Sequence, residues 1–479
     1  MHRTDRRDFL RTIAALSAAA LPARGSAGGD ARTEWYRDAK FGMFLHWGAY
    51  SVAGVEASWP IMLPKLAPQG GPITEADYRA LPQRFNPVKY DPQAWVAKAR
   101  QAGMQYMVIT TKHHDGFCMF DAPGTDYKIT KTKFGRDVVA ELAQACKSAK
   151  MKLGFYYSPP DMNHPGYRDT SKLAVENWEG EPARPEWKSY LDYMELHIRT
   201  LLTKYGDVAV LWFDGLFGQD KYDPPRFHKL IRQLSPKTLV NDRLGPDLGD
   251  FVTPEQFFPT GIPVKRVERA PELTGALLAQ LADAMAQHKM PPKEVVESLT
   301  QWQKKAYPTA LHPSADQFQL WETCMTLNNT WGYCPADKNF KTTDKLIRTL
   351  SEVASRGGNF LLNVGPTPEG TFPPEAEERL RGVGEWMALN RDSIRGTAYG
   401  PVQGARAFRT TTKAGKVYVH VFEWPEHALE ITGFPSKVRE VATLSTKQKL
   451  VFRQTSSQVE IDMPSAPSKP GPTVLEVLV

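Results

Sequence analysis

Residues 106–114 read YMVITTKHH, an apolar run that ends in a lysine and two histidines. A short run rich in β-branched and large apolar residues is typical of a buried strand. The same design recurs seven more times before position 366, with longer amphipathic stretches between the runs. The other runs are 41–47, 152–158, 208–214, 238–242, 250–255, 320–326 and 359–365.

Strands that alternate with amphipathic helices form parallel sheets, and eight such strands close a barrel. A doubly wound open sheet is the alternative, but its first strand normally leads into a glycine-rich phosphate turn. Here the first run ends in His46, Trp47 and Gly48 instead. We therefore predict an α/β fold, a (β/α)8-like TIM barrel, followed by a small C-terminal β-sandwich.

Polar residues close the predicted strands, which is expected at the C-terminal rim of a barrel, where active sites lie. These residues are His46, His113, His114, Tyr157, Asp214, Arg243, Glu255 and Glu322.

Three segments depart from the barrel repeat, which we assign to residues 28–398. A helical insertion at about 263–318 separates the sixth and seventh strands and either covers the site or decorates the periphery. From 399 to 479 the apolar period changes to two, which predicts the β-sandwich. Residues 1–27 carry Arg6 and Arg7, then an apolar stretch, then small residues.

That N-terminus resembles a twin-arginine export signal, and it is too short and too rich in alanine to span a bilayer permanently. We expect no integral membrane segment. The mature protein should begin near Arg24 or Gly28 and be periplasmic or secreted. A disordered basic tail is the alternative interpretation.

Composition argues against several classes of function. The 60 basic and 53 acidic residues give a net charge of +7, but they are scattered rather than clustered, so nucleic-acid binding is not expected. The four cysteines are unevenly spaced and include no CxxC pair. They indicate neither a zinc site nor a disulfide framework, although one bridge stays open.

The run 208–214 delivers Asp214 from apolar and aromatic surroundings, which suits a nucleophile or base. An aspartate that only begins a turn before Gly215 is the alternative. Glu255 and Glu322 end or lie within neighbouring strands, and either could face Asp214. Two carboxylates about 5 Å apart are what a retaining glycosidase needs.

Seven motifs occur in order: WYRDAKFGMFLHWGAYSV, KHHDGF, GFYYS, LWFDG, VNDR, WETC with WGY, and GGNFLLNVGPTPEGTFP. Together they resemble the alpha-L-fucosidases of glycoside hydrolase family 29 from about Trp35 to Tyr399, apart from the insertion. The resemblance implies a barrel followed by a sandwich, and retaining hydrolysis of terminal alpha-L-fucose without a cofactor. It implies a fucosylated oligosaccharide or glycoconjugate as substrate.

The resemblance also implies roles for individual residues. Asp214 falls on the nucleophile. The fucose-binding positions fall on His46, Trp59, His113, His114, Tyr157, Trp212 and Arg243. Ser58 stands where many members have a glutamate, which leaves the contribution of the nearby Glu56 open.

Family members differ in the position of the acid/base residue, so both glutamates stay candidates. We favour Glu255, because it ends its strand after Pro254. Glu322, in contrast, lies between Trp321 and Cys324, so a structural hydrogen bond deeper in its strand is an equal alternative to catalysis.

We expect no metal, because His113 and His114 are adjacent on a strand and should point to opposite faces. Neutral imidazoles suit sugar hydroxyls, since each offers one donor and one acceptor. Three alternatives stay open: a non-catalytic carbohydrate-binding protein on this fold, a different retaining glycosidase, and a metal-dependent hydrolase that a chelator would inactivate.

Overall fold

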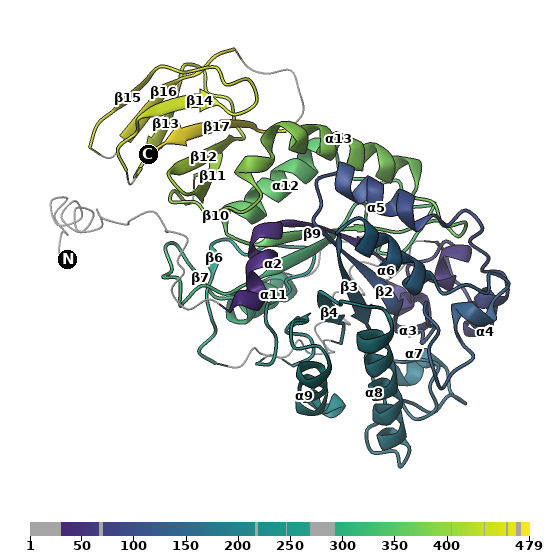
Figure 1. The fold of residues 1–479 in the computed structure, drawn as a ribbon. Helices are drawn as coiled ribbons and strands as arrows, with labels where there is room; N and C mark the ends of the chain where they lie inside the picture. The colour runs from purple at the N-terminus through teal and green to yellow at the C-terminus, as the bar shows by residue number, and fades with distance from the viewer. Residues whose placement is uncertain are drawn as a thin grey trace.

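The computed structural model describes residues 30–479 except 67–69, 216–218, 246, 269–292, 404, 435, 457 and 466–470; residues 1–27, for which we predict an export signal, lie outside this range. Seven parallel strands form one curled sheet in the order β5-β4-β3-β2-β1-β9-β8 (Figure 1). The strands are β1 (Phe41–Leu45), β2 (Tyr106–Lys112), β3 (Lys152–Tyr157), β4 (Val210–Phe213), β5 (Leu239–Val240), β8 (Glu322–Thr326) and β9 (Asn359–Val364).

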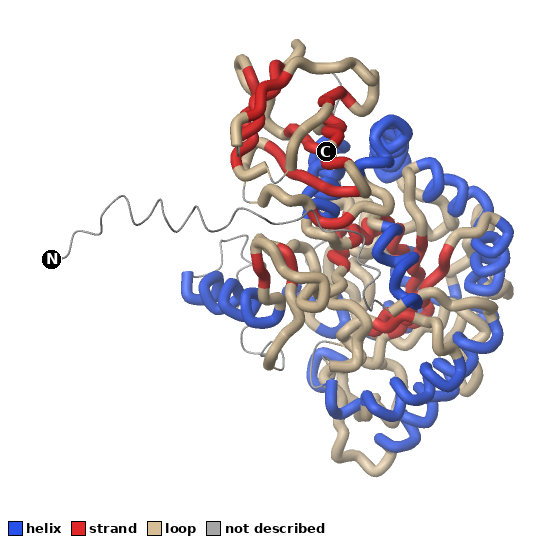
Figure 2. The backbone as a smooth tube through the Cα atoms, turned by 60° about the vertical axis from the view of Figure 1, so that its left-hand side comes forward, coloured by secondary structure: helices blue, strands red, loops and turns tan. Residues whose placement is uncertain are grey.

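Helices follow most of the strands and surround the sheet (Figure 2). Several begin at a side chain that caps the free backbone N–H groups of the first turn: Asp91 accepts from Ala94 N, and Asp137 accepts from Ala140 N. The α-helices are α2 (Glu34–Ala39), α3 (Trp59–Met62), α4 (Glu75–Ala80), α5 (Pro92–Gln101), α6 (Val138–Ser148), α7 (Ala174–Asn177), α8 (Trp187–Lys204), α9 (Pro224–Leu234), α11 (Lys293–Ala306), α12 (Thr343–Ser355) and α13 (Pro374–Asn390).

The sixth predicted strand, 250–255, closes the barrel without forming a regular strand. Isolated parallel bridges join Phe251 to Asn241 on one side. On the other side they join Val252 to Trp321, directly before β8, and Glu255 to Cys324 of β8. The carboxylate of Asp250 accepts Val240 N at 2.8 Å, which fixes this segment against β5. The fold is therefore the predicted (β/α)8-like barrel, with one member of its ring reduced to bridges.

Side chains alternate between the barrel interior and the helical layer, as strand geometry requires. The interior cluster includes Phe44, Tyr106, Tyr156 and Trp212. Their strand neighbours, such as Tyr157, belong to the larger cluster between the sheet and the helices. The interior is therefore packed with aromatic rings below the rim.

The chain leaves the barrel between 250–256 and β8, in the part for which we predict a helical insertion. Its base is a short antiparallel pair, β6 (Ile262–Pro263) with β7 (Thr309–Ala310), and α11 precedes β7. Tyr307 donates to Thr253 O at 3.3 Å, so the insertion packs on the segment that leads to Glu255. The predicted helix at 272–289 lies outside the described residues.

Two antiparallel sheets form the C-terminal part, beside α12 and α13 (Figures 1 and 2). Val417, Val441 and Val477 of one sheet and Ile461 of the other share a buried cluster, which makes the predicted sandwich. The sheets are β10-β11-β12-β17-β14 and β13-β16-β15, with bounds Ala398–Tyr399 (β10), Phe408–Lys413 (β11), Lys416–Val421 (β12), Ala428–Thr432 (β13), Glu440–Thr443 (β14), Phe452–Gln454 (β15), Gln458–Asp462 (β16) and Thr473–Leu478 (β17).

The four cysteines, Cys118, Cys146, Cys324 and Cys334, are buried and unpaired, so the open question of a bridge is answered. Among the described residues, no helix combines the length and the apolar character that crossing a membrane requires.

Candidate active site

Two carboxylates at the C-terminal rim share one guanidinium group. Arg243 follows β5, and its Nη1 donates to Asp214 Oδ1 at 2.8 Å while its Nη2 donates to Glu255 Oε2 at 2.7 Å. The arginine side chain is only 3% exposed, whereas those of Asp214 and Glu255 are 18% and 32% exposed. A bound molecule can therefore reach both carboxylates, and the cation between them fixes their positions.

The surroundings push the pKa values of these carboxyls apart. Burial raises the pKa of Asp214, but Arg243, His114 and Tyr156 outweigh it and leave the pKa below the usual aspartate value. Burial and the negative charge of Asp214 raise the pKa of Glu255 above its usual value, although Arg243 opposes them. An ionised carboxylate beside a protonated carboxyl is the arrangement that acid/base catalysis uses.

Aromatic rings support Asp214 from below. Tyr156 donates to Asp214 Oδ2 at 2.7 Å and stacks on Trp212, with ring centroids 5.6 Å apart. The guanidinium carbon of Arg243 lies 4.7 Å from the Trp212 ring centroid, in cation–π contact. Trp212 thus contacts both side chains that donate hydrogen bonds to Asp214, Tyr156 and Arg243.

The structure places Tyr156, not the predicted Tyr157, at the site. Tyr157 points outward from β3, where its hydroxyl contacts His197 Nδ1 of α8 at 3.2 Å. Lys112 Nζ lies 4.8 Å from its ring centroid. The prediction chose the last residue of the strand, but the side chain that faces the interior is the one before it.

Glu322 lies inside the barrel, away from the rim. It is the first residue of β8, and its carboxylate accepts hydrogen bonds from Tyr36, Tyr106 and Trp212. Tyr106 is the first residue of β2, so this cluster marks the N-terminal end of the barrel. Burial raises the pKa of Glu322 to about 7, against those donors. This geometry supports the structural interpretation of Glu322.

Three buried histidines surround the open side of Asp214. Asn363 donates through Nδ2 to Trp331 O, so its Oδ1, 2.7 Å from His46 Nδ1, accepts a hydrogen bond from the N–H of that nitrogen. Ser158 donates its hydroxyl proton to Pro160 O at 2.8 Å, so Ser158 Oγ accepts from His114 Nδ1 at 2.6 Å.

Both imidazoles therefore present an unprotonated Nε2 as an acceptor. Burial lowers the pKa of His46 and of His114 to about 4. Burial and the two neighbouring histidines lower the pKa of His113 well below its usual value. The three rings are neutral near pH 7, which suits hydrogen bonds with the hydroxyl groups of a sugar.

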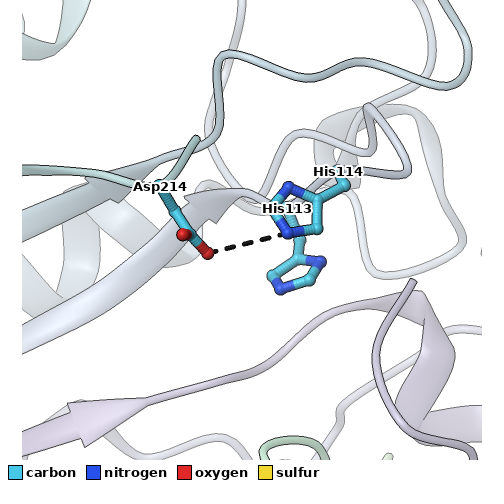
Figure 3. A group of neighbouring side chains, drawn as sticks. All are labelled: His113, His114 and Asp214. Atoms are coloured by element: carbon cyan, nitrogen blue, oxygen red, sulfur yellow. Dashed lines mark ion pairs between the residues drawn. The ribbon is translucent and has the colours of Figure 1, made fainter. Parts of the chain in front are cut away.

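His113 and His114 do not point to opposite faces, contrary to the prediction. Pairing of β2 with β3 shifts register between Thr110 and Lys112, and the two histidine rings lie 4.2 Å apart. With Asp214 they form a group whose candidate ligand atoms lie within 4.8 Å of one another (Figure 3). The argument from alternation therefore fails as a reason against a metal ion.

Electrostatics still disfavours a metal in this group. Asp214 Oδ1 already pairs with the guanidinium of Arg243, and a divalent cation on the same carboxylate would be repelled by that charge. His114 Nε2 and Asp214 Oδ2 are 3.6 Å apart, and both accept hydrogen bonds. A hydroxyl group beside this pair can donate its one hydrogen bond to either acceptor.

Comparisons with known proteins identify the family. A family model described as alpha-L-fucosidase matches residues 21–302 and 278–392. An alpha-L-fucosidase of Dictyostelium discoideum is 25% identical over 92% of this chain and 87% of its own length, and one of Branchiostoma floridae is 27% identical over 91% and 90%. The solved structure of alpha-L-fucosidase isoenzyme 1 from Paenibacillus thiaminolyticus is 32% identical, covers 94% of this chain and 98% of its own, and has a TM-score of 0.76.

The chain belongs to the alpha-L-fucosidase family, glycoside hydrolase family 29. It is an enzyme, an alpha-L-fucosidase, as the ordered motifs predicted.

In this fucosidase, Ser58 takes a structural role at the position where many family members have a glutamate. Ser58 Oγ is hydrogen-bonded to His113 Nδ1 and accepts Asp115 N at 3.1 Å, so the serine orients a histidine of the pocket. Glu56 does not take the place of the missing acid, because its carboxylate accepts the backbone N–H groups of Trp331 and Gly332. Burial raises the pKa of Glu56 to about 8.

Two aromatic side chains border the histidines at the mouth. Trp59 begins α3, is half-buried, and meets His114 edge to face at 5.7 Å between ring centroids. The ring centroids of Trp331 and His46 are 4.9 Å apart. Beside them, a cavity of about 250 Å³ between the loops after β8 and β9 has Asn363 in its wall.

Sequence reasoning missed several residues that position the site. Asn363, Ser158 and Ser58 each hold one pocket histidine, and Tyr156 holds the carboxylate. Asn363 lies on β9, between β1 and β8, and Tyr156 lies on β3, directly before the predicted Tyr157; both face the interior. Counting alternate residues back from the rim, rather than reading only strand ends, could have found them.

We predict that Ser158→Ala raises KM of this fucosidase about three- to tenfold, because losing a net hydrogen bond of about 1 kcal/mol leaves the orientation of His114 unfixed. Steady-state kinetics on an aryl alpha-L-fucoside would measure it. Ser158→Thr keeps a hydroxyl and should restore KM, and the exposed Ser171→Ala is the matched control. An unchanged KM in Ser158→Ala would contradict the positioning role.

Proposed function

We propose that Asp214 is the nucleophile and Glu255 the acid/base residue in the retaining hydrolysis of terminal alpha-L-fucosides. The observation that carries this assignment is the shared contact of both carboxylates with Arg243 at the rim. Glu322 is buried under three hydrogen-bond donors and has no such contact.

In the first step, Asp214 attacks the anomeric carbon and Glu255 protonates the leaving oxygen, which releases the aglycone and leaves a fucosyl ester on Asp214. Water then attacks the same carbon, Glu255 takes its proton, and Asp214 leaves as a carboxylate. The lowered pKa of Asp214 keeps it ionised for attack, and the raised pKa of Glu255 keeps it protonated for the first step.

The histidines and aromatic rings bind the sugar in this proposal. Neutral Nε2 atoms of His46 and His114 accept hydrogen bonds from its hydroxyl groups, and Trp59 offers a half-exposed apolar face to the ring. Each contact turns the anomeric carbon toward Asp214, which lowers the entropic cost of reaching the transition state. The substrate is a fucosylated oligosaccharide or glycoconjugate.

Asp214→Gly should lower turnover on the order of 10³-fold or more, because the covalent step is lost while the pocket remains. Added azide should restore part of the rate and give a fucosyl azide of inverted configuration, which NMR would identify. Asp126→Gly, at a side chain 87% exposed, is the matched control. A variant that keeps more than a tenth of wild-type turnover would exclude Asp214 as nucleophile.

Glu255→Gln should remove the alkaline limb of the pH profile of kcat/KM. In the wild type the rate falls with rising pH as Glu255 loses its proton, and its raised pKa places this limb above the usual glutamate range. The acid limb, from protonation of Asp214, lies below the usual aspartate range and should persist. Turnover of natural fucosides should fall about 10²- to 10⁴-fold, while an activated aryl fucoside still releases its aryl group in the first step.

Glu322→Gln is the control for this assignment. Its side chain sits at the base of the barrel, so we expect reduced thermal stability, similar losses on both substrates and an intact alkaline limb. The roles are exchanged if Glu322→Gln loses the limb and Glu255→Gln leaves both substrates nearly unaffected.

We also propose that residues 1–27 direct export of the folded enzyme through a twin-arginine route, to the periplasm or beyond. The adjacent Arg6 and Arg7 before an apolar stretch support this. Replacing both with lysine should keep activity in the cytoplasmic fraction of a bacterial host, whereas Arg11→Lys should not. Undisturbed export of the double variant would rule out the twin-arginine route.

A further inference from the structure

A basic groove lies at the end of the barrel opposite Asp214. It has a volume of about 620 Å³ and is lined by the segments that follow α5, α6 and α13. The segments after α5 and α6 lead into the N-terminal ends of β2 and β3, whereas Asp214 follows the C-terminal end of β4. Helix α5 packs against both α6 and α13, which brings the three helix ends together (Figure 1).

Four cations line this groove, and its lining includes no aspartate or glutamate: Arg100, Lys150, Arg391 and Arg395. Within the described part of the chain, none of the four forms an ion pair with a carboxylate. Arg100 donates to Ala149 O at 3.2 Å, and Arg395 donates to Gln105 Oε1, so neutral acceptors hold both guanidinium groups.

The negative ends of the three helix dipoles offset only part of this positive charge. The C-terminus of a helix carries roughly half a negative charge, so three helix ends offset less than half of four cations. Burial and the positive charge of Arg391 lower the pKa of Arg395, with Asp392 opposing them. Lys413 of β11 adds a further cation nearby, since it donates to Arg395 O at 3.4 Å. The groove therefore has an excess of positive charge.

Lys150 occupies a position that does not favour lysine. It follows the end of α6 with φ of 54°, in the left-handed region where glycine is the preferred residue. A lysine there strains the backbone, and it places its charge in the groove. Local folding gives no reason for a lysine at this position.

We propose that this groove binds the sulfate, phosphate or carboxylate groups of an acidic glycan, as a second carbohydrate-binding site remote from the catalytic one. Its volume falls in the range of ligand sites, and charges spread over three elements suit several anionic groups on one chain better than one small ion. The apolar lining consists of methionines and alanines without an aromatic ring, so bases of single-stranded nucleic acid would have nothing to stack on.

Binding of a heparin hexasaccharide, measured by isothermal titration calorimetry, tests the proposal directly, with maltohexaose and inorganic sulfate as comparison probes. The groove variant replaces four cations with glutamine: Arg100→Gln, Lys150→Gln, Arg391→Gln and Arg395→Gln. A control variant with the same change in net charge uses side chains that are 58% to 92% exposed elsewhere: Lys131→Gln, Lys188→Gln, Lys293→Gln and Arg406→Gln.

We expect the groove variant to bind the heparin hexasaccharide at least about tenfold more weakly, or about 1.4 kcal/mol, and the control to stay within about twofold of wild type. Affinity of the wild type should fall as salt rises. Equal losses in both variants, equal binding of maltohexaose, or inorganic sulfate binding as tightly as the hexasaccharide would each overturn the proposal.

Lys150→Gly separates binding from folding. Relief of the left-handed strain should raise the melting temperature, while affinity for the hexasaccharide falls; unchanged affinity would remove Lys150 from the site. All variants should keep wild-type turnover of an aryl alpha-L-fucoside, because the groove lies away from Asp214. The outcome is therefore independent of the assigned nucleophile and acid/base residue.

Discussion

The guanidinium of Arg243, held between Asp214 and Glu255, is the contact on which the catalytic arrangement depends. Two carboxyls in a partly buried pocket repel each other when both are ionised, so burial alone would raise both pKa values. A cation bonded to each of them, with additional donors on only one, breaks this symmetry. Asp214 also receives the Tyr156 hydroxyl and faces His114, and therefore it is the one that stays ionised.

The support for that cation extends through the barrel to its opposite end. Arg243 lies on the face of Trp212, and Trp212 donates to Glu322 at the base. Tyr36 and Tyr106 donate to the other carboxylate oxygen of Glu322. A buried carboxylate with hydrogen bonds to both oxygens orients its neighbours. Glu322 thus contributes to the site by fixing the indole on which Arg243 and Tyr156 rest.

Sequence periodicity predicted the fold because it depends on features that repeat along the chain. Eight apolar runs with polar ends indicated the barrel, and the change to a period of two indicated the sandwich. We predicted a regular strand at 250–255, but only isolated bridges form there. Gly249 directly precedes this segment and Pro254 lies within it, and both residues disfavour regular strand pairing. The positions of Asp214, Arg243 and Glu255 at the rim follow from the strand ends alone.

The errors arise where one residue of register decides the outcome. A strand end does not reveal which of its last two side chains faces inward, so Tyr157 was chosen over Tyr156. The irregular register of β2 and β3 brings His113 and His114 to the same side, which no pattern of residue types indicates. Glu322 is the first residue of its strand. An apolar run in the sequence does not show which of its residues lies at the buried base of the barrel and which at the rim.

Burial of the three histidines determines what kind of ligand the pocket can hold. Because the imidazoles are neutral, Arg243 and the ionised Asp214 are the charges that face a bound molecule while Glu255 is protonated. Protonation of any of the rings would place a positive charge in a desolvated site, and this unfavourable burial of charge is what lowers their pKa values. An uncharged ligand rich in hydroxyl donors therefore meets acceptors whose direction is already set by Asn363 and Ser158. The same neutrality leaves the opposite charges of Arg243 and Asp214 undisturbed, so sugar recognition and nucleophile ionisation are compatible in one pocket.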